Sequence, residues 1–74
     1  MKHYTYNEYD PTSSKADASG GYRVTVSEDW IRQQYWPYWQ QKMQEKYKDD
    51  PDLITWDNCL HDWIITNWAW ETNE

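Results

Sequence analysis

The sequence predicts an α+β fold: a small single domain in which a two-stranded antiparallel hairpin precedes two antiparallel helices. Apolar and polar residues alternate in two short segments, at about residues 3–9 and 21–26. Two longer segments, at about 28–48 and 56–70, repeat apolar residues at the helical spacing of three or four. The chain of 74 residues is too short for a second core, so we expect one domain over 1–74.

The hairpin prediction rests on alternation. In the first segment Tyr4 and Tyr6 flank Thr5, and the second segment runs from a pair of glycines to Ser27. The connection at about 11–20 is small and polar, which is typical of a mobile loop. We expect the larger side chains of both strands to face the first helix; they are Tyr4, Tyr6, Tyr22, Val24 and Val26. Because two strands alone are marginally stable, their exposed edge is a candidate for pairing with a second copy.

The first helix has agreeing signals at both ends. Ser27 is a good N-cap, the acidic pair Glu28 and Asp29 follows it, and three lysines crowd the last turns. Pro37 lies inside this helix and removes one backbone hydrogen bond. We therefore predict a kink at Pro37. The alternative is a split, with a second helix that begins at Pro37.

The second helix follows a turn at residues 49–52, in which Pro51 interrupts three aspartates. Thr55 is its expected N-cap, and about six residues join the helices, which favours antiparallel packing. We expect it to extend to about Trp70. Apolar residues cover more than half of its circumference, with Ile65 and Trp68 lying off the main stripe, so it is either deeply buried or a contact surface.

The composition favours a binding role. Seven Trp and seven Tyr accompany only eight Ile, Leu and Val residues. Fourteen large aromatics cannot all be interior in so small a domain, and Trp and Tyr are enriched in binding hot spots. Cys59 is the only cysteine, which favours a reducing compartment, and no segment is apolar enough for a signal peptide or a membrane span. We expect a cytoplasmic protein that does not contact membranes, in the host cytoplasm if it is viral.

Charge is unevenly distributed along the chain. Residues 1–48 carry six acids and seven bases, whereas residues 49–74 carry seven acids and no Lys or Arg, which together give −6. An acidic segment rich in Trp could imitate the phosphates of a nucleic acid, or dock on a basic groove of another protein. The simpler interpretation is a solvated acidic face that keeps the protein soluble. The net negative charge disfavours direct nucleic-acid binding.

Catalytic and metal sites have weak support. Asp57 and His61 would share a helix face, but Cys59 projects at a large angle from both, which spoils a Cys and His couple. A surface pair of Asp57 and His61 is the simpler interpretation. The histidines, the cysteine and the acids do not show a known metal-ligand spacing, so we expect no catalytic residue, no metal and no cofactor.

The sequence therefore predicts a non-enzymatic, acidic protein-binding module whose partner is a larger protein with a basic surface. In size, acidity and aromatic content the chain resembles the small accessory proteins that phages make to inhibit host machinery. The resemblance implies an inhibitor that occupies a basic, nucleic-acid-binding surface of a host enzyme. The expected binding residues are Trp30, Trp36, Trp56, Trp63, Trp68, Trp70, Asp49, Asp50, Asp52, Asp57 and Asp62.

Two alternatives remain open at this point. One is a structural homodimer closed by the aromatic surplus and the strand edge. The other is a single-strand nucleic-acid binder that stacks bases on Trp and Tyr. The second needs a basic groove, which Arg23, Arg32, Lys42 and Lys46 could line, although neighbouring acids dilute it.

Overall fold

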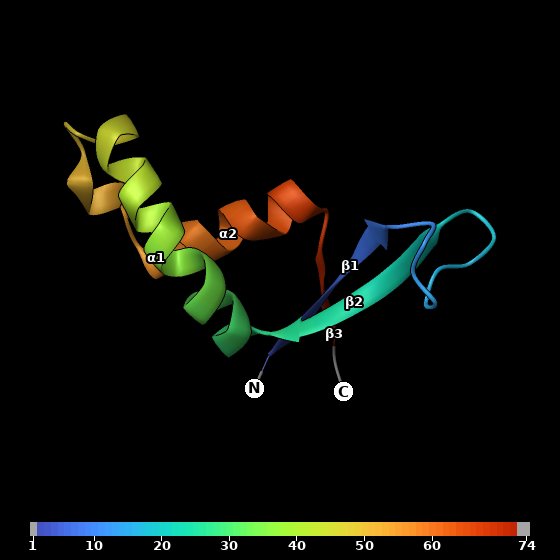
Figure 1. Cartoon of the computed structure of the whole chain (residues 1–74). Helices are drawn as coiled ribbons and strands as arrows, with labels where there is room; N and C mark the ends of the chain where they lie inside the picture. Colours follow the sequence, from blue (N-terminus) through green and yellow to red (C-terminus); the bar gives the residue numbers. More distant parts are fainter. Residues whose placement is uncertain (1, 73–74) are drawn as a thin grey trace.

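The chain forms an α+β domain with a three-stranded antiparallel sheet and two α-helices (Figure 1). The structure is a computed structural model and describes residues 2–72. In chain order the elements are β1 (His3–Tyr9), β2 (Gly21–Ser27), α1 (Glu28–Lys46), the 3₁₀ helix η1 (Pro51–Leu53), α2 (Trp56–Asn67) and β3 (Trp70–Thr72). The predicted hairpin is confirmed in place and in its antiparallel pairing.

The third strand was not predicted, and the expected extension of the last helix to Trp70 is wrong. The helix α2 ends at Asn67, and Trp68 adopts a left-handed conformation with φ of 55°. The chain then reverses, and Trp70–Thr72 pairs with His3–Thr5, so that β1 lies at the centre of the sheet. A helix usually stops at a glycine or before a proline. Neither follows Asn67, so the sequence carries no ordinary stop signal there.

Hydroxyl groups tie the three strands together on one face of the sheet. The hydroxyl of Thr5, which is buried, shares hydrogen bonds with the hydroxyls of Thr25 on β2 and Thr72 on β3. The guanidinium of Arg23 lies 5.6 Å from the ring centroid of Trp70 on β3. A three-residue strand offers few backbone hydrogen bonds, so these side-chain contacts help to hold it.

The opposite face of the hairpin packs on both helices, whereas contact with the first helix alone was expected. The ring of Tyr6 meets Trp63 of α2 edge-on at 5.5 Å between centroids, and Tyr4 meets the same indole at 6.4 Å. The first helix contributes Ile31 of its first turn to this cluster. Tyr4, Ile31 and Trp63 therefore form the core that joins the sheet to both helices.

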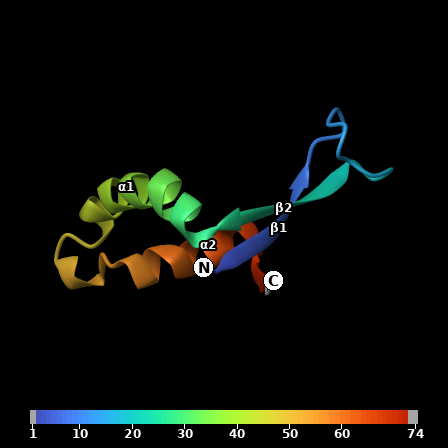
Figure 2. The ribbon, with the colours of Figure 1, turned by 90° about the horizontal axis from the view of Figure 1, so that it is seen from below.

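The helix α1 passes through Pro37 without interruption, so the alternative of two separate helices is wrong. It begins where expected, because the Ser27 hydroxyl accepts a hydrogen bond from the Trp30 N–H at 3.1 Å. Figure 2 shows α1 arching over α2. Trp39 and Met43 pack with Cys59 of α2 in a second core cluster.

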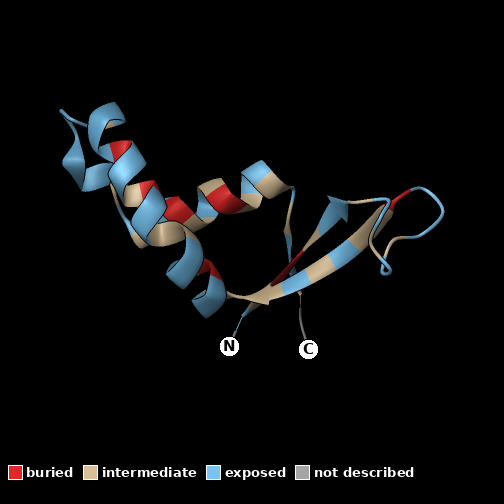
Figure 3. Ribbon diagram, viewed as in Figure 1, coloured by how far each residue is buried: buried red, intermediate tan, exposed pale blue. Residues whose placement is uncertain are grey.

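The molecule is elongated. Its principal extents are 47 × 26 × 17 Å, and its Cα radius of gyration is 14.6 Å, against about 11 Å for a compact domain of this length. The hairpin projects from the helices, and buried residues gather where the elements meet (Figures 1 and 3). None of the described helices has the length and apolar character needed to cross a membrane.

Candidate protein-binding surface

An apolar surface runs along α2, and we call it the α2 surface. One part is a groove of about 300 Å³ between α1 and α2. The other is a depression of about 350 Å³ at the C-terminal end of α2, lined by Ile64, Ile65, Trp68 and Ala69. Ile65 lines both hollows, so the two form one continuous surface.

Trp68 is the most unusual residue of this surface. Its side chain is 87% exposed, and its φ of 55° is one that a bulky residue rarely adopts. The backbone conformation caps the helix, since the N–H of Ala69 donates to the Ile64 carbonyl at 2.9 Å. Glycine would make the same cap without steric cost. Neither packing nor backbone geometry in the monomer therefore explains a tryptophan here.

Two exposed aliphatic residues extend the surface along the groove. Ile65 is 59% exposed and Leu53, in η1, is 44% exposed. Both line the groove together with polar residues from each helix, which include Lys46, Asn58 and His61. Single exposed aliphatic residues are common, but a continuous exposed apolar surface is typical of a binding site.

The sequence placed Asp62 among residues for charge contact, and the structure gives it an internal role. Its carboxylate accepts hydrogen bonds from the Tyr35 hydroxyl at 2.9 Å and from the Trp39 indole N–H at 3.1 Å. Burial and this carboxylate raise the pKa of the Tyr35 phenol above its ordinary range. Asp62 thus ties α1 to α2.

The other predicted aspartates remain on the surface. Asp49, Asp50, Asp52 and Asp57 are exposed, in the turn between the helices and the first turn of α2. Within residues 2–72 the one ion pair joins the Lys2 ammonium to Glu71 at 3.6 Å, so these four carboxylates have no salt-bridge partner. They lie beside Leu53 along the chain and supply negative charge at one end of the α2 surface.

The six predicted tryptophans are distributed over different parts of the molecule. Trp63 is 6% exposed and belongs to the core, so its indole is not available to a partner in this structure. Trp36 and Trp56 are half-buried and meet edge-on at 5.9 Å between ring centroids. Trp30 is exposed near the start of α1, and Trp70 lies under Arg23 on the sheet. Of the six, Trp68 alone lines the α2 surface.

Ile65 and Leu53 were absent from the predicted binding residues. The sequence did carry a signal for Ile65, because it lies off the apolar stripe of its helix together with Trp68. Leu53 gave none, since its exposure depends on how η1 sits at the end of the helix pair.

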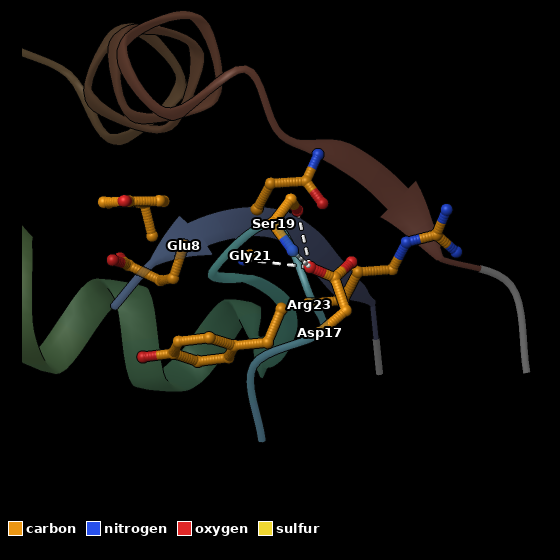
Figure 4. Close-up of a pocket in the computed structure, with 8 residues that line it drawn as sticks. Glu8, Asp17, Ser19, Gly21 and Arg23 are labelled. Carbon is orange, nitrogen blue, oxygen red and sulfur yellow. Dashed lines mark hydrogen bonds between the residues drawn. The ribbon is translucent and has the colours of Figure 1, made fainter. Parts of the chain in front are cut away.

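A third hollow lies in the hairpin and has a polar lining (Figure 4). The Asp17 carboxylate accepts hydrogen bonds from the Ser19 hydroxyl at 2.5 Å and from the N–H groups of Ser19 at 2.8 Å and Gly21 at 3.3 Å. These bonds, that of the hydroxyl most of all, lower the pKa of Asp17. Gly20 between them has a φ of 86°, which glycine adopts without strain. This carboxylate therefore serves the turn that closes the loop.

The surroundings of Cys59 are those of a core residue. Cys59 is fully buried, and burial together with the nearby Asp62 raises the pKa of its thiol to about 12. A thiolate is the reactive form, so Cys59 is not poised as a nucleophile. Residues 2–72 contain no group of three or more His, Cys, Asp and Glu side chains placed to hold a metal ion.

Comparison of the chain with known protein families, with characterised proteins and with solved structures finds no match. The function has to be argued from the surface itself.

Proposed function

We propose that the protein is a non-catalytic binding module that docks its α2 surface on a basic surface of a larger protein. The observation that carries this proposal is Trp68, an exposed indole at a position where glycine would serve the fold better. A left-handed conformation costs a non-glycine residue on the order of 1 kcal/mol. Retaining tryptophan at that cost is explained if its indole is buried by a partner.

The neighbours of Trp68 suit such a contact. Tryptophans that anchor protein interfaces insert into apolar pockets and contribute about 2 kcal/mol or more to binding. Ile64 and Ile65 flank the indole and supply further apolar area. The projecting side chain would enter a pocket of the partner, while the depression beside it would receive a side chain from the partner.

Charge indicates the chemistry of the partner. Asp49, Asp50, Asp52 and Asp57 are exposed without salt-bridge partners, in a segment that holds no Lys or Arg. A partner rich in Arg and Lys at its binding surface would complement them and associate faster at low salt. Surfaces that bind nucleic-acid phosphates have this composition. The role that fits best is therefore an inhibitor, of the kind phages direct at host enzymes, that occupies or redirects such a surface.

Capture from lysate of the source cell tests the apolar part of the proposal. Tagged wild-type protein and the variants Trp68→Gly and Tyr38→Ala serve as baits, and captured proteins are quantified by mass spectrometry. Tyr38 is the matched control because it is an exposed aromatic on α1 outside both hollows. We expect one dominant basic protein to be retained by wild type and Tyr38→Ala, and reduced at least tenfold with Trp68→Gly. Equal capture by all three baits would contradict the proposal.

A second variant tests the electrostatic part. Replacement of Asp50, Asp52 and Asp57 by Asn removes three charges and leaves Asp62, which ties the helices together, unchanged. We expect the captured partner to be bound more weakly at low salt and its binding to depend less on salt. If affinity and salt dependence are unchanged, the partner surface is not recognised by charge.

A further inference from the structure

The strand β2 forms one edge of the sheet along its whole length, and this edge carries a second, independent binding feature. The sheet order is β2-β1-β3, so no described strand pairs with the outer side of β2. In Figure 1, α1 leaves one end of β2 and the loop leaves the other. Free backbone groups on an edge strand are a template for another strand.

The hydrogen bonds at the two ends of the hairpin show which groups point outward. The Asp10 N–H donates to the Gly20 carbonyl, and the Glu28 N–H donates to the Lys2 carbonyl, both at 2.9 Å. In an antiparallel pair, hydrogen-bonded positions alternate. The even-numbered residues of β2 therefore bond to β1, and the odd-numbered residues direct their N–H and C=O groups outward.

Hydrogen bonds already use most of the backbone groups at the two ends of this outer edge. At the loop end, the Gly21 carbonyl accepts from the Asp17 N–H at 2.9 Å, and the Gly21 N–H donates to the Asp17 carboxylate. At the other end, Ser27 is the N-cap of α1, a position whose carbonyl accepts the first hydrogen bond of the helix. Between the two ends, Arg23 and Thr25 each keep an N–H and a C=O free, which makes four open groups; the N–H of Ser27 also points outward.

We propose that a second copy of the chain pairs with these four groups, joining two sheets through antiparallel β2 strands with a two-fold axis at Val24. In this register Arg23 lies opposite Thr25 of the second copy, and Thr25 lies opposite its Arg23. Each of these pairs exchanges two backbone hydrogen bonds, so the interface forms four and uses the N–H and C=O groups of Arg23 and Thr25 in both copies. The product is a continuous six-stranded sheet.

Other symmetric registers are worse. An axis at Arg23 places the two guanidinium groups opposite each other, where like charges destabilise a strand pair, and it turns Thr25 toward the occupied Gly21. An axis at Thr25 turns Arg23 toward Ser27, whose carbonyl is used by the helix. The axis at Val24 alone avoids both problems.

Charge and apolar area also favour a second copy as the occupant. The strand carries no acidic residue although the chain has a net charge of −6, so two acidic molecules can approach here. Val24 and Tyr22 are half-buried and lie outside the core cluster of Tyr4, Ile31 and Trp63. In the dimer Val24 faces Val24 of the second copy across the axis, and Tyr22 faces its Val26. The incompletely covered sheet faces at Tyr22 and Val24 of the two copies then form one continuous apolar face.

A charge-swap experiment tests this interface. The variants Val24→Lys and Val24→Glu each place like charges across the axis, whereas their mixture places opposite charges there. Sedimentation velocity from low to high micromolar concentration measures the oligomeric state. We expect wild type to dimerise as concentration rises, each variant alone to stay monomeric, and the equimolar mixture to dimerise. Far-ultraviolet circular dichroism checks that each variant is folded, which the position of Val24 outside the core favours.

Disulfide trapping tests the register. Val24→Cys places two thiols at a close, non-hydrogen-bonded pair across the axis, within bridging distance. In Thr25→Cys, the matched control, the new thiols lie two residues out of register and too far apart to bridge. Cys59 is buried and does not compete. Oxidation should give a covalent dimer with Val24→Cys and not with Thr25→Cys.

The proposal fails if wild type stays monomeric at high micromolar concentration, or if the charged variants dimerise as it does. Equal trapping at both positions would also overturn the register. The test is independent of the α2 surface, because Val24→Lys leaves Trp68 unchanged and should still capture the partner protein.

Discussion

At the scale of single residues, we expect Trp68 to lower the stability of the free protein while it contributes to partner binding. Trp68→Gly relieves the left-handed backbone, so we expect the free energy of unfolding to rise by up to about 1 kcal/mol. For a domain of this length that corresponds to a rise of about 4–8 °C in Tm. Thermal unfolding followed by circular dichroism measures it. Trp68→Ala is the control, because it removes the indole and keeps the backbone cost. An equal gain with alanine would mean that the exposed indole, and not the φ angle, is what destabilises the protein.

Buried ionisable groups predict how stability depends on alkaline pH. Burial raises the pKa of Cys59 to about 12 and raises that of Tyr35, Tyr4 and Tyr6 above their ordinary value near 10. A pKa raised by folding stabilises the protein below the unfolded-state pKa, and this stabilisation is lost as pH rises toward the folded-state value. We expect the urea midpoint to be constant from pH 7 to about 8.5 and to fall above about pH 9. A midpoint that stays constant to pH 10.5 would contradict these shifts.

At the scale of elements, residue alternation and helix-capping residues were sufficient to predict the first two strands and the starts of both helices. Burial alternates along β2 from Tyr22 to Val26, and Ser27 and Thr55 cap their helices through hydroxyl groups. The end of α2 was not predictable in the same way. Trp68 is an unfavourable residue for a left-handed cap. The strand β3 has only three residues, so its pairing with β1 depends on tertiary contacts such as the hydrogen bonds among the hydroxyls of Thr5, Thr25 and Thr72.

The same distinction applies to the binding residues. The predicted binding residues included six of the seven tryptophans with equal weight, because an aromatic stripe does not show which members face inward. The fold buries Trp63 between two strands and a helix and leaves Trp68 exposed, five residues later in the chain. The predicted mobility of the loop at 11–20 remains a prediction; its backbone is folded into turns that the carboxylates of Asp10 and Asp17 hold.

The proline in α1 gives a prediction at this scale. Pro37 is exposed and sits about 200° around the helix from the buried Trp39. Pro37→Ala restores an N–H that can donate to the Gln33 carbonyl and loses little buried area. We expect the free energy of unfolding to rise by about 1–3 kcal/mol in urea titrations. A loss of stability would show that the packing of Trp39 and Met43 on α2 requires the arch.

At the scale of the whole molecule, an elongated chain with two small core clusters depends on the residue that connects them. Trp63 packs against Tyr4 and Tyr6 of the hairpin and lies one turn from Cys59, a member of the second cluster. Beyond Tyr4, Tyr6 and Val26, the hairpin has little apolar contact with the helices, because Tyr22 and Val24 lie outside the core. Hairpin and helices should therefore unfold together, with Trp63 as the residue that couples them.

We expect Trp63→Ala to cost about 3–5 kcal/mol, which is a large share of the roughly 4–11 kcal/mol that about 0.05–0.15 kcal/mol per residue gives for this length. At 25 °C or just above, the variant should show no near-ultraviolet circular dichroism signal, and on heating it should show no cooperative thermal transition. Trp30→Ala removes an exposed indole and is the matched control, with an expected change within about 0.5 kcal/mol. A Trp63→Ala protein that kept a cooperative helical transition while losing the hairpin alone would contradict a single unfolding unit. It would also show that the α2 surface can be presented to a partner without the sheet.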